Sequence, residues 1–378
     1  MDGIVTENNL STLKRTVKSI VREYVYPVDR NGEQISEEVT KQLQEKGKQA
    51  GLWLMGTNKK LGGAGLSFYN RTVLFEEAVQ HRYGLNKTAG LAFGKDLPSF
   101  LEKCTAEQVE KYIKPSAQTG NGCFMAVWET TENNDVNQLA TTAIKEADYW
   151  IINGEKSYVA NVDEADFGVV LVNCVLDNEE VKPTLFILEK DDSIIVNEKN
   201  LIDVQKVSQL TFNSYKLYDS QRVGEIGEGA SLIQQWLVES QLEIAAKCIG
   251  IGQIAVKLGI DYAKLRITRG QPLAEFPTIR TMVARSAIEL ESARQLVRRA
   301  AKELDEQGNK ANTTVAMAKL HATEVASQIV DRVFQIHGGM GFSGDAPLER
   351  WYKELRILRL NYLSSESLIE QIALQYFE

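Results

Sequence analysis

Hydrophobic positions in the first third of the chain recur at three- and four-residue steps, which is the spacing of one face of an α-helix. In the segment 10–28 that face contains Leu13, Val17, Ile20, Val21 and Tyr24. Ser36, followed by two glutamates, predicts an N-cap and a helix that ends near Gly47 or Gly51. After a glycine-rich turn (KKLGGAGLSF), further helices are expected over 68–81 and from 106 to about Pro115.

The pattern changes near Gly122 to short runs that are rich in β-branched and aromatic residues. The runs are CFMAVWE, YWIING, KSYVANV, FGVVLVNCVL and PTLFILEK, and the region closes with QLTFNSYKLYDSQRVGEIGEGA. Acidic or Asn/Gly turns separate the runs, which is typical of an antiparallel sheet.

Long helices return from Ser231 onward, first through Leu232, Ile233, Trp236 and Leu237. The order helix, sheet, helix predicts an α+β fold that is mainly α, rather than the alternating strands and helices of a dinucleotide-binding sheet. We therefore expect an N-terminal helical domain (1–121), a middle antiparallel β-domain (122–230) and a C-terminal helical bundle (231–378).

Composition is that of an ordinary globular protein, with 378 residues, 43% hydrophobic and 25% charged. The net charge of -8 supplies no positive field, so no nucleic-acid partner is expected. No run approaches the roughly 18 apolar residues of a membrane span, and the N-terminus carries acids too early for a signal peptide. Four separated cysteines and three scattered histidines predict no disulfide framework and no metal site, and they fit a cytoplasmic protein.

Four segments, taken together and in this order, resemble the acyl-CoA dehydrogenase family. They are NGEKSYVAN (family pattern NGxKxWITN), RVGEIGEGASLI (GxxGxG), YAKLRITRGQPL (YxxxRxxFGxxL) and VFQIHGGMGFSGDAPLERWYKELRI (QxxGGxGF…P…R…RDxRI). The resemblance implies that the C-terminal bundle has four helices. It also implies FAD, with its isoalloxazine ring against the β-domain and its pyrophosphate and adenine among C-terminal helices, partly of a neighbouring subunit.

Five residues carry the implied cofactor site at the C-terminal end. Arg266 matches an arginine that pairs with the FAD pyrophosphate, and Thr268 would add a hydroxyl donor. Gln335, Gly338 and Gly339 match the site where the backbone approaches the adenine half, although the two glycines could instead form a simple helix C-cap. The resemblance further assigns to the cofactor site Val127, Trp128, Asn134, Tyr158, Ala160, Leu273, Ser364 and Glu366, and to the substrate site Asn134, Asn361 and Tyr362.

The flavin-ring side departs from the family pattern. The motif TEPxAGSD appears as WETTENND at 128–135, which keeps Glu129 and Asp135 but has Trp128 in place of a threonine. Tyr158 stands where a tryptophan is usual, and Ala160 replaces a threonine whose hydroxyl bonds near flavin N5. These exchanges, with Arg269 at a usual phenylalanine position, predict altered contacts to the flavin ring.

The position of the catalytic base is the second departure. The family's Y-E-G-T motif appears as N-Y-L-S, which places Tyr362 where the glutamate removes the α-proton. A phenol with a pKa of about 10 is a poor base at neutral pH. A second location used by some members matches Ser240, and the adjacent Glu239 and Glu243 are alternative bases, unless they are exposed or salt-bridged as helical glutamates usually are. The backbone N–H of Tyr362 could still polarise a thioester carbonyl.

Two classes of function follow from this resemblance. The first is a FAD-dependent oxidoreductase acting on the CH–CH bond of an acyl thioester carried by CoA or an acyl carrier protein, with an electron-accepting flavoprotein as a further partner. The second is a non-catalytic or non-redox member, either a structural subunit or a thioester-binding lyase or cyclase, with weakened or lost FAD binding. In both classes we expect an oligomer, a dimer or homotetramer or a hetero-oligomer with a paralogue.

Overall fold

A computed structural model describes residues 7–27, 35–82, 85, 88–130, 136, 139–177, 179–202, 204–344 and 346–377. The chain forms two compact units. We call them the helical unit (Met1–Trp53, Leu66–Phe93 and Leu237–Glu378) and the β unit (Leu54–Gly65 and Gly94–Trp236). The three-domain division expected from the sequence stays a prediction. In the described part of the chain, no helix is both long and apolar enough to cross a membrane.

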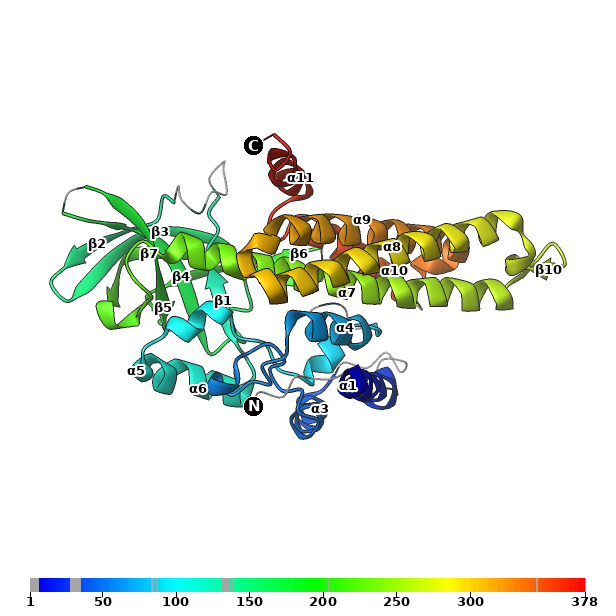
Figure 1. The fold of residues 1–378 in the computed structure, drawn as a ribbon, viewed down its shortest axis with the longest axis horizontal. Helices are drawn as coiled ribbons and strands as arrows, with labels where there is room; N and C mark the ends of the chain where they lie inside the picture. Colours follow the sequence, from blue (N-terminus) through cyan, green and yellow to red (C-terminus); the bar gives the residue numbers. More distant parts are fainter. Residues whose placement is uncertain are drawn as a thin grey trace. The chain divides into compact units, whose positions relative to one another are not determined.

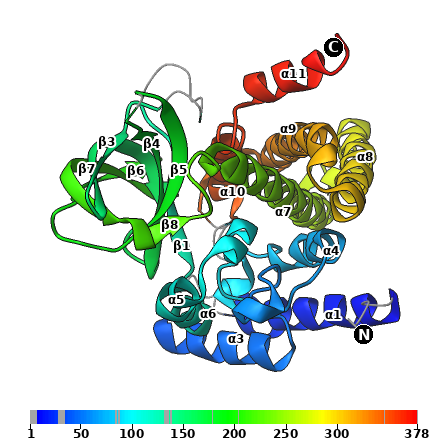
Figure 2. The same cartoon turned by 60° about the vertical axis from the view of Figure 1, so that its left-hand side comes forward.

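The helical unit is built around the long helices of the C-terminal region, which run side by side in both ribbon views (Figure 1, Figure 2). These are α7 (Gly229–Leu265), α8 (Pro277–Gln307), α9 (Asn312–His337) and α10 (Leu348–Leu358). The first residues of α7 belong to the β unit. A last helix, α11 (Ser365–Leu374), follows α10 in the sequence. The N-terminal part supplies α1 (Glu7–Ile20), a π-helical turn (Val21–Val25), α3 (Glu37–Gln49) and α4 (Phe68–Ala78).

The predicted apolar face of the first helix is confirmed for Val17, Ile20 and Val21, which are buried, whereas Tyr24 is exposed. The N-cap is also confirmed, because the Ser36 hydroxyl accepts a hydrogen bond from the Val39 N–H at 3.2 Å.

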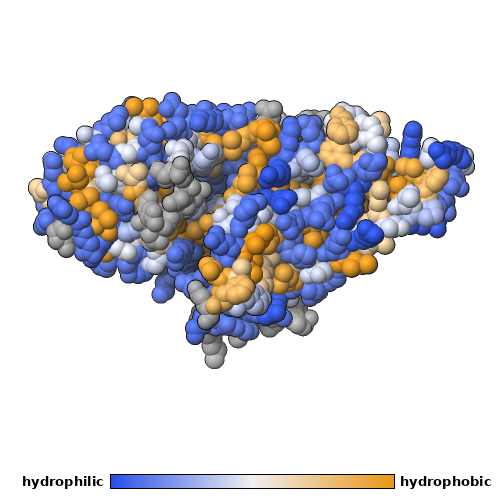
Figure 3. Space-filling view, turned by 90° about the horizontal axis from the view of Figure 1, so that it is seen from above, coloured by the Kyte–Doolittle hydropathy of each residue, from blue (hydrophilic) through white to orange (hydrophobic). Residues whose placement is uncertain are grey.

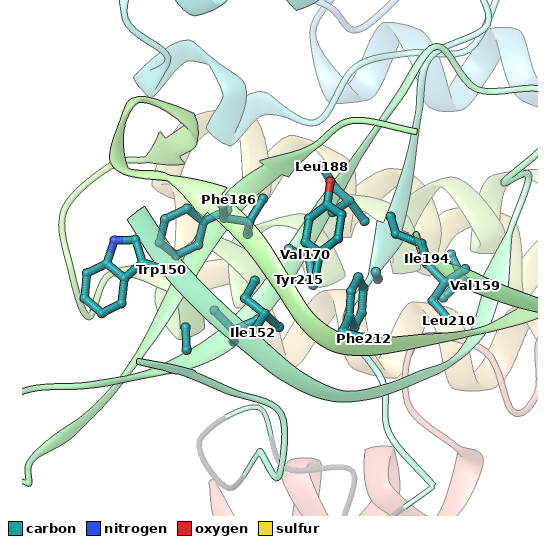
Figure 4. Close-up of a cluster of buried hydrophobic side chains, with 14 of the residues drawn as sticks. Trp150, Ile152, Val159, Val170, Phe186, Leu188, Ile194, Leu210, Phe212 and Tyr215 are labelled. Carbon is teal, nitrogen blue, oxygen red and sulfur yellow. The ribbon is translucent and has the colours of Figure 1, made fainter. Parts of the chain in front are cut away.

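The β unit contains one eight-stranded sheet in the order β6-β7-β3-β2-β4-β5-β8, with β1 paired to β4. The strands are β1 (Cys123–Ala126), β2 (Thr142–Glu146), β3 (Tyr149–Ala160), β4 (Phe167–Val175), β5 (Val181–Leu188), β6 (Ile195–Leu201), β7 (Gln205–Tyr218) and β8 (Arg222–Val223). Most pairs are antiparallel, as expected, but β1 and β2 pair with β4 in parallel. Figure 4 shows the apolar core of this unit, in which Trp150 and Phe186 meet edge to face at 6.1 Å.

Two details of the predicted strands are wrong. YWIING and KSYVANV form the single strand β3, because Asn153–Gly154 makes a bulge rather than a turn. Gly154 has a φ of 141°, and a Cβ there would come within 2.7 Å of Thr141. The strands β2 and β6 were not expected, and β6 has no buried face whose alternation could reveal it.

The helix predicted to end near Pro115 continues to Thr119. It consists of α5 (Ala106–Gln108), the π-helical turn η5 (Val109–Ile113) and α6 (Lys114–Thr119). The wider hydrogen-bonding pattern of the π turn places Pro115 in the first turn of α6, where a residue without an N–H is tolerated. Gly120, with a φ of 75°, then ends the helix.

Candidate active site

A turn between α10 and α11, residues 359–364, carries the residue expected at the family's base position; we call it the Tyr362 turn. Tyr362 and Leu363 have φ values of 51° and 81°. Left-handed backbone costs a non-glycine residue roughly 1–2 kcal/mol, so two successive residues in this region need support from their surroundings. Ser364 closes the turn as the N-cap of α11, accepting from the Ser367 N–H at 3.1 Å.

Two buried side chains bind the backbone of this turn. The Gln241 amide on α7 donates to the Tyr362 carbonyl at 2.9 Å. The Lys319 ammonium on α9 donates to the Leu363 carbonyl at 2.7 Å. Gln241 is 2% exposed and Lys319 is fully buried. Burial lowers the pKa of Lys319 to about 8.

A carboxylate on α7 acts on the same turn through its charge. Glu243 pairs with Lys247 at 2.6 Å, one turn further along α7. Burial disfavours its ionised form, but the charge and hydrogen bond of Lys247 and the charge of Arg71 outweigh this effect and lower the pKa of Glu243. Burial, and then the charge of Glu243, raise the pKa of Tyr362 to about 12. The charge of Glu243 therefore acts on a phenol that keeps its proton, but Glu243 itself is salt-bridged, the arrangement that counts against a helical glutamate as a base.

The remaining predicted residues near the turn are placed as follows. Glu239, the other candidate base, is half-buried one helical turn before Glu243. Asn361 is half-buried, and its N–H donates to the Ile357 carbonyl at 3.1 Å. Glu366 is exposed in the first turn of α11, where an acid is favourable.

A second cluster lies at the far end of α7 (Figure 1). The hairpin β9 (Ile267–Thr268) and β10 (Gln271–Pro272) follows the helix, and the Leu273 N–H donates to the Arg266 carbonyl at 2.8 Å. Arg266 and Arg269 are exposed, while Thr268 is half-buried. The hairpin therefore presents two guanidinium groups, which suit phosphate oxygens.

The end of α9 meets the end of α7 at this cluster. The rings of Tyr262 and His337 stack at 4.1 Å, and the Tyr262 hydroxyl donates to the His337 carbonyl at 3.4 Å. Gly338 caps α9 with a φ of 56°, so the helix-cap interpretation of this glycine is confirmed. Both Gly338 and Gly339 have open space where a Cβ would stand, and Gln335 is exposed. This open space and the exposed guanidinium groups of the hairpin leave room for a phosphorylated ligand at this end of the bundle.

The β unit contains a buried ion pair between two residues of the family motifs. Lys156 Nζ lies 2.7 Å from Glu129 Oε1 and 3.1 Å from the Val127 carbonyl. The same carboxylate accepts from the N–H groups of Ala140 and Thr141 at 2.7 and 3.1 Å. Burial lowers the pKa of Lys156 to about 8 against the charge of Glu129. Glu129 therefore joins the segment after β1 to β3 and to the start of β2.

The predicted flavin-ring residues lie around this pair. The Ser157 N–H donates to the Trp128 carbonyl at 2.7 Å, so the backbone of Trp128 lies against the residue before Tyr158. Tyr158 is 60% exposed and has a φ of 58°. Val127 is buried and Ala160 is half-buried, whereas Asn134 lies outside the described residues.

Known protein families and relatives match most of the chain in sequence. The N-terminal domain of acyl-CoA dehydrogenase matches residues 7–119, and its C-terminal domain matches residues 227–376. The mitochondrial short-chain specific acyl-CoA dehydrogenase of Homo sapiens is 30% identical over 321 residues, covering 84% of this chain and 77% of the relative. The 3-(aryl)acrylate reductase of Clostridium sporogenes is 30% identical over 341 residues, covering 87% and 88%. The chain belongs to the acyl-CoA dehydrogenase family.

The acyl-CoA dehydrogenase fold expected from the motifs is confirmed. An acyl-CoA dehydrogenase from Bacillus anthracis, complexed with FAD, matches with a TM-score of 0.84 at 22% identity, covering 98% of this chain and 67% of that chain. Helices α7 to α10 form the expected C-terminal bundle, and the sheet lies between the N-terminal and C-terminal helices in the sequence.

The family motifs did not reveal Gln241, Lys319 and Lys247 as parts of these clusters, and they contained Lys156 without predicting its ion pair. Lys319 had a signal, because it is a lone lysine on an alanine-rich stretch (TVAMAKLHATEVA) that is otherwise suited to burial. Gln241 had none, since a glutamine on a long helix is usually exposed. Among the described residues, no group of three or more His, Cys, Asp or Glu side chains could hold a metal ion.

Proposed function

We propose that this chain is a FAD-dependent oxidoreductase that acts on the CH–CH bond of an acyl thioester, with Glu243 as the proton acceptor. The observation that carries the proposal is the ionised Glu243 carboxylate, whose charge acts on Tyr362 and which would leave its ion pair with Lys247 to accept a proton. Tyr362 retains its proton at neutral pH and is a poor base, whereas a carboxylate can accept a proton from a carbon acidified by the thioester. Glu239 is the alternative acceptor on the same helix.

Cofactor binding is the next part of the proposal. Arg266 would pair with the pyrophosphate, the Thr268 hydroxyl would add a donor, and the open space at Gly338 and Gly339 would admit the adenine half. Tyr158, exposed on β3, would lie against the flavin ring. FAD, when bound, supplies the hydride acceptor. The related enzyme from Bacillus anthracis is a complex with FAD, which supports this choice.

The protein is proposed to act as an oligomer of at least two copies. Glu243 and Leu265 lie about 33 Å apart on the single helix α7, at a rise of about 1.5 Å per residue. A FAD that reaches the Tyr362 turn of one copy would therefore not reach the Arg266 hairpin of the same copy. A second copy would supply the hairpin. Sedimentation at micromolar concentration should give at least a dimer, and a monomer of 42.3 kDa would contradict the proposal.

Exposed hydrophobic residues are compatible with such an assembly. Ile288 on α8 and Leu374, Tyr376 and Phe377 at the C-terminal end are exposed. On the face seen in Figure 3, hydrophobic residues form separate groups among polar ones. Burial of several such groups is typical of a stable interface. The homotetramer, the cytoplasmic location and the choice between CoA and an acyl carrier protein stay predictions.

Two glutamate variants test the proposed base. The purified protein is loaded with FAD, checked by its visible spectrum, and assayed with acyl-CoA thioesters of different chain lengths and an artificial electron acceptor. Glu243→Gln should lower turnover by about 10²–10⁴-fold, because it keeps the shape of the side chain but removes the base. Glu239→Gln, one turn away on the same helix, is the matched control and should change turnover by less than threefold. The reverse order would assign the base to Glu239.

A non-redox member of the family is the second candidate. The exchanges at Trp128, Ala160 and Arg269 favour it, because each replaces a residue that the family pattern places against the cofactor. A colourless protein that cannot be reconstituted with FAD, but that binds an acyl-CoA in calorimetry, would establish this second function and refute the first. An electron-accepting flavoprotein would then have no role.

A further inference from the structure

Gln241 and Lys319 hold the Tyr362 turn at two successive carbonyl groups. We propose that both are positioning residues of the reaction, which keep this turn in one conformation beside Glu243. The role in the reaction rests on the proposed function. The two hydrogen bonds to the turn do not depend on it.

The turn has a conformation that its own sequence does not favour. The second position of the family's E-G-T sequence is a glycine, which adopts positive φ without strain, whereas this chain has Leu363 with a φ of 81°. Tyr362, before it, also has positive φ. Without external contacts, a tyrosine followed by a leucine would relax towards negative φ.

The two donors oppose that relaxation. Rotating either residue to negative φ would turn its carbonyl away from its donor, at 2.9 Å for Gln241 and 2.7 Å for Lys319. Because both donors are buried, a lost bond would not be replaced by water, and its loss is expensive. The two bonds therefore fix the planes of two consecutive peptide groups.

The same helix carries the proposed base. Gln241 and Glu243 are two residues apart on α7, so the helix that binds the turn also carries the proposed base. The peptide group that follows Tyr362 is consequently held by Gln241, and the next one by Lys319, from α9. A displacement of about 1 Å between reacting groups is enough to lower turnover about 100-fold.

The test compares variants that remove a donor but keep the side chain's length. Gln241→Met and Lys319→Met each remove one bond to the turn. Gln108→Met in the β unit is the matched control, because Gln108 is also buried and donates to two backbone carbonyls, those of Ser220 and Arg222, each at 2.8 Å. All three variants lose a buried amide or amine donor, but only the first two change the turn.

Two measurements are made on the FAD-loaded protein: amide hydrogen exchange over residues 360–364, and kcat and KM with butyryl-CoA. Gln241→Met and Lys319→Met should each speed exchange in this segment at least tenfold and lower kcat at least tenfold, with the Kd for FAD unchanged. Gln108→Met should change neither. Unchanged exchange would overturn the inference, and so would faster exchange with unchanged kcat, since the contacts would then be merely structural.

A rescue variant covers the case in which a single variant folds poorly. Leu363→Gly adopts positive φ without help, so adding it to Gln241→Met should restore kcat at least threefold, and absence of any rescue would count against the inference. Failure of the proposed function is distinguishable from failure of the inference. If the wild-type protein binds neither FAD nor any of the acyl-CoA thioesters of different chain lengths, the function is refuted, and hydrogen exchange alone decides whether the two donors hold the turn.

Discussion

Replacing Lys156 with methionine should destabilise the protein strongly, because it removes one partner of a buried ion pair. Lys156 is fully buried and Glu129 is 7% exposed, with 2.7 Å between Nζ and Oε1. Removing one partner of such a pair typically costs about 3–5 kcal/mol of unfolding free energy. The N–H groups of Ala140 and Thr141 still donate to the carboxylate, so we expect the lower end, about 3 kcal/mol, at pH 7.

The loss should depend on pH in a defined direction. In the wild type the pKa of Glu129 is lowered: burial opposes this, but the charge of Lys156 and the hydrogen bonds prevail. Its contribution is therefore present above the ordinary glutamate pKa and is lost as the pH falls. In the Lys156→Met variant burial dominates and the carboxyl takes up a proton more easily. The difference between the two proteins should thus shrink from pH 7 towards pH 4.5.

Urea denaturation followed by circular dichroism measures both effects. The control is Lys206→Met, which makes the same substitution in the exposed pair between β7 and β6, where Lys206 and Glu198 are 3.5 Å apart. Exposed pairs contribute about 0–1 kcal/mol, so the control should lose little. If Lys156→Met lost no more stability than Lys206→Met, or if its deficit grew as the pH fell, the reasoning about this pair would be refuted.

Three further outcomes are expected. Arg266→Ala should weaken FAD binding by roughly 1.5–3 kcal/mol and Thr268→Ala by about 1, as measured by titration; equal losses would mean that the pyrophosphate does not meet Arg266. Leu363→Gly should be about 1 kcal/mol more stable than Leu363→Ala, because alanine retains the left-handed strain. The control is the exposed helical position Gln295, where Gln295→Ala should be more stable than Gln295→Gly. The same order at both positions would argue against strain at Leu363. Burial raises the pKa of Glu354 to about 7, so the wild type loses stability as the pH rises from the ordinary glutamate value through 7. Glu354→Gln should remove that slope and gain about 1–3 kcal/mol at pH 8; parallel melting curves against pH would contradict it.

Local features of this protein were determined by the sequence alone. The apolar face of α1 and the Ser36 cap depend on residues within one or two helical turns of each other, so their spacing predicts them. The family motifs are local in the same sense. The hairpin at Arg266–Leu273 and the glycine cap of α9 are each formed within about ten residues; the motif matches located both segments, the first as a cofactor segment without its hairpin, and the cap was an alternative to the cofactor interpretation.

The tertiary structure decided what happens where distant segments meet. Whether Asn153–Gly154 is a turn or a bulge depends on the neighbouring strands, and Pro115 is accommodated because a π-helical turn precedes it. Gln241, Lys319 and Tyr362 belong to three separate segments, and nothing in the spacing of any one of them predicts that two donors reach one turn. The physical reason is that a buried polar group must find its partner among whatever packs against it. Here the partners are determined by how α7, α9 and the turn pack together, and the spacing of residues within any one of these segments does not predict them.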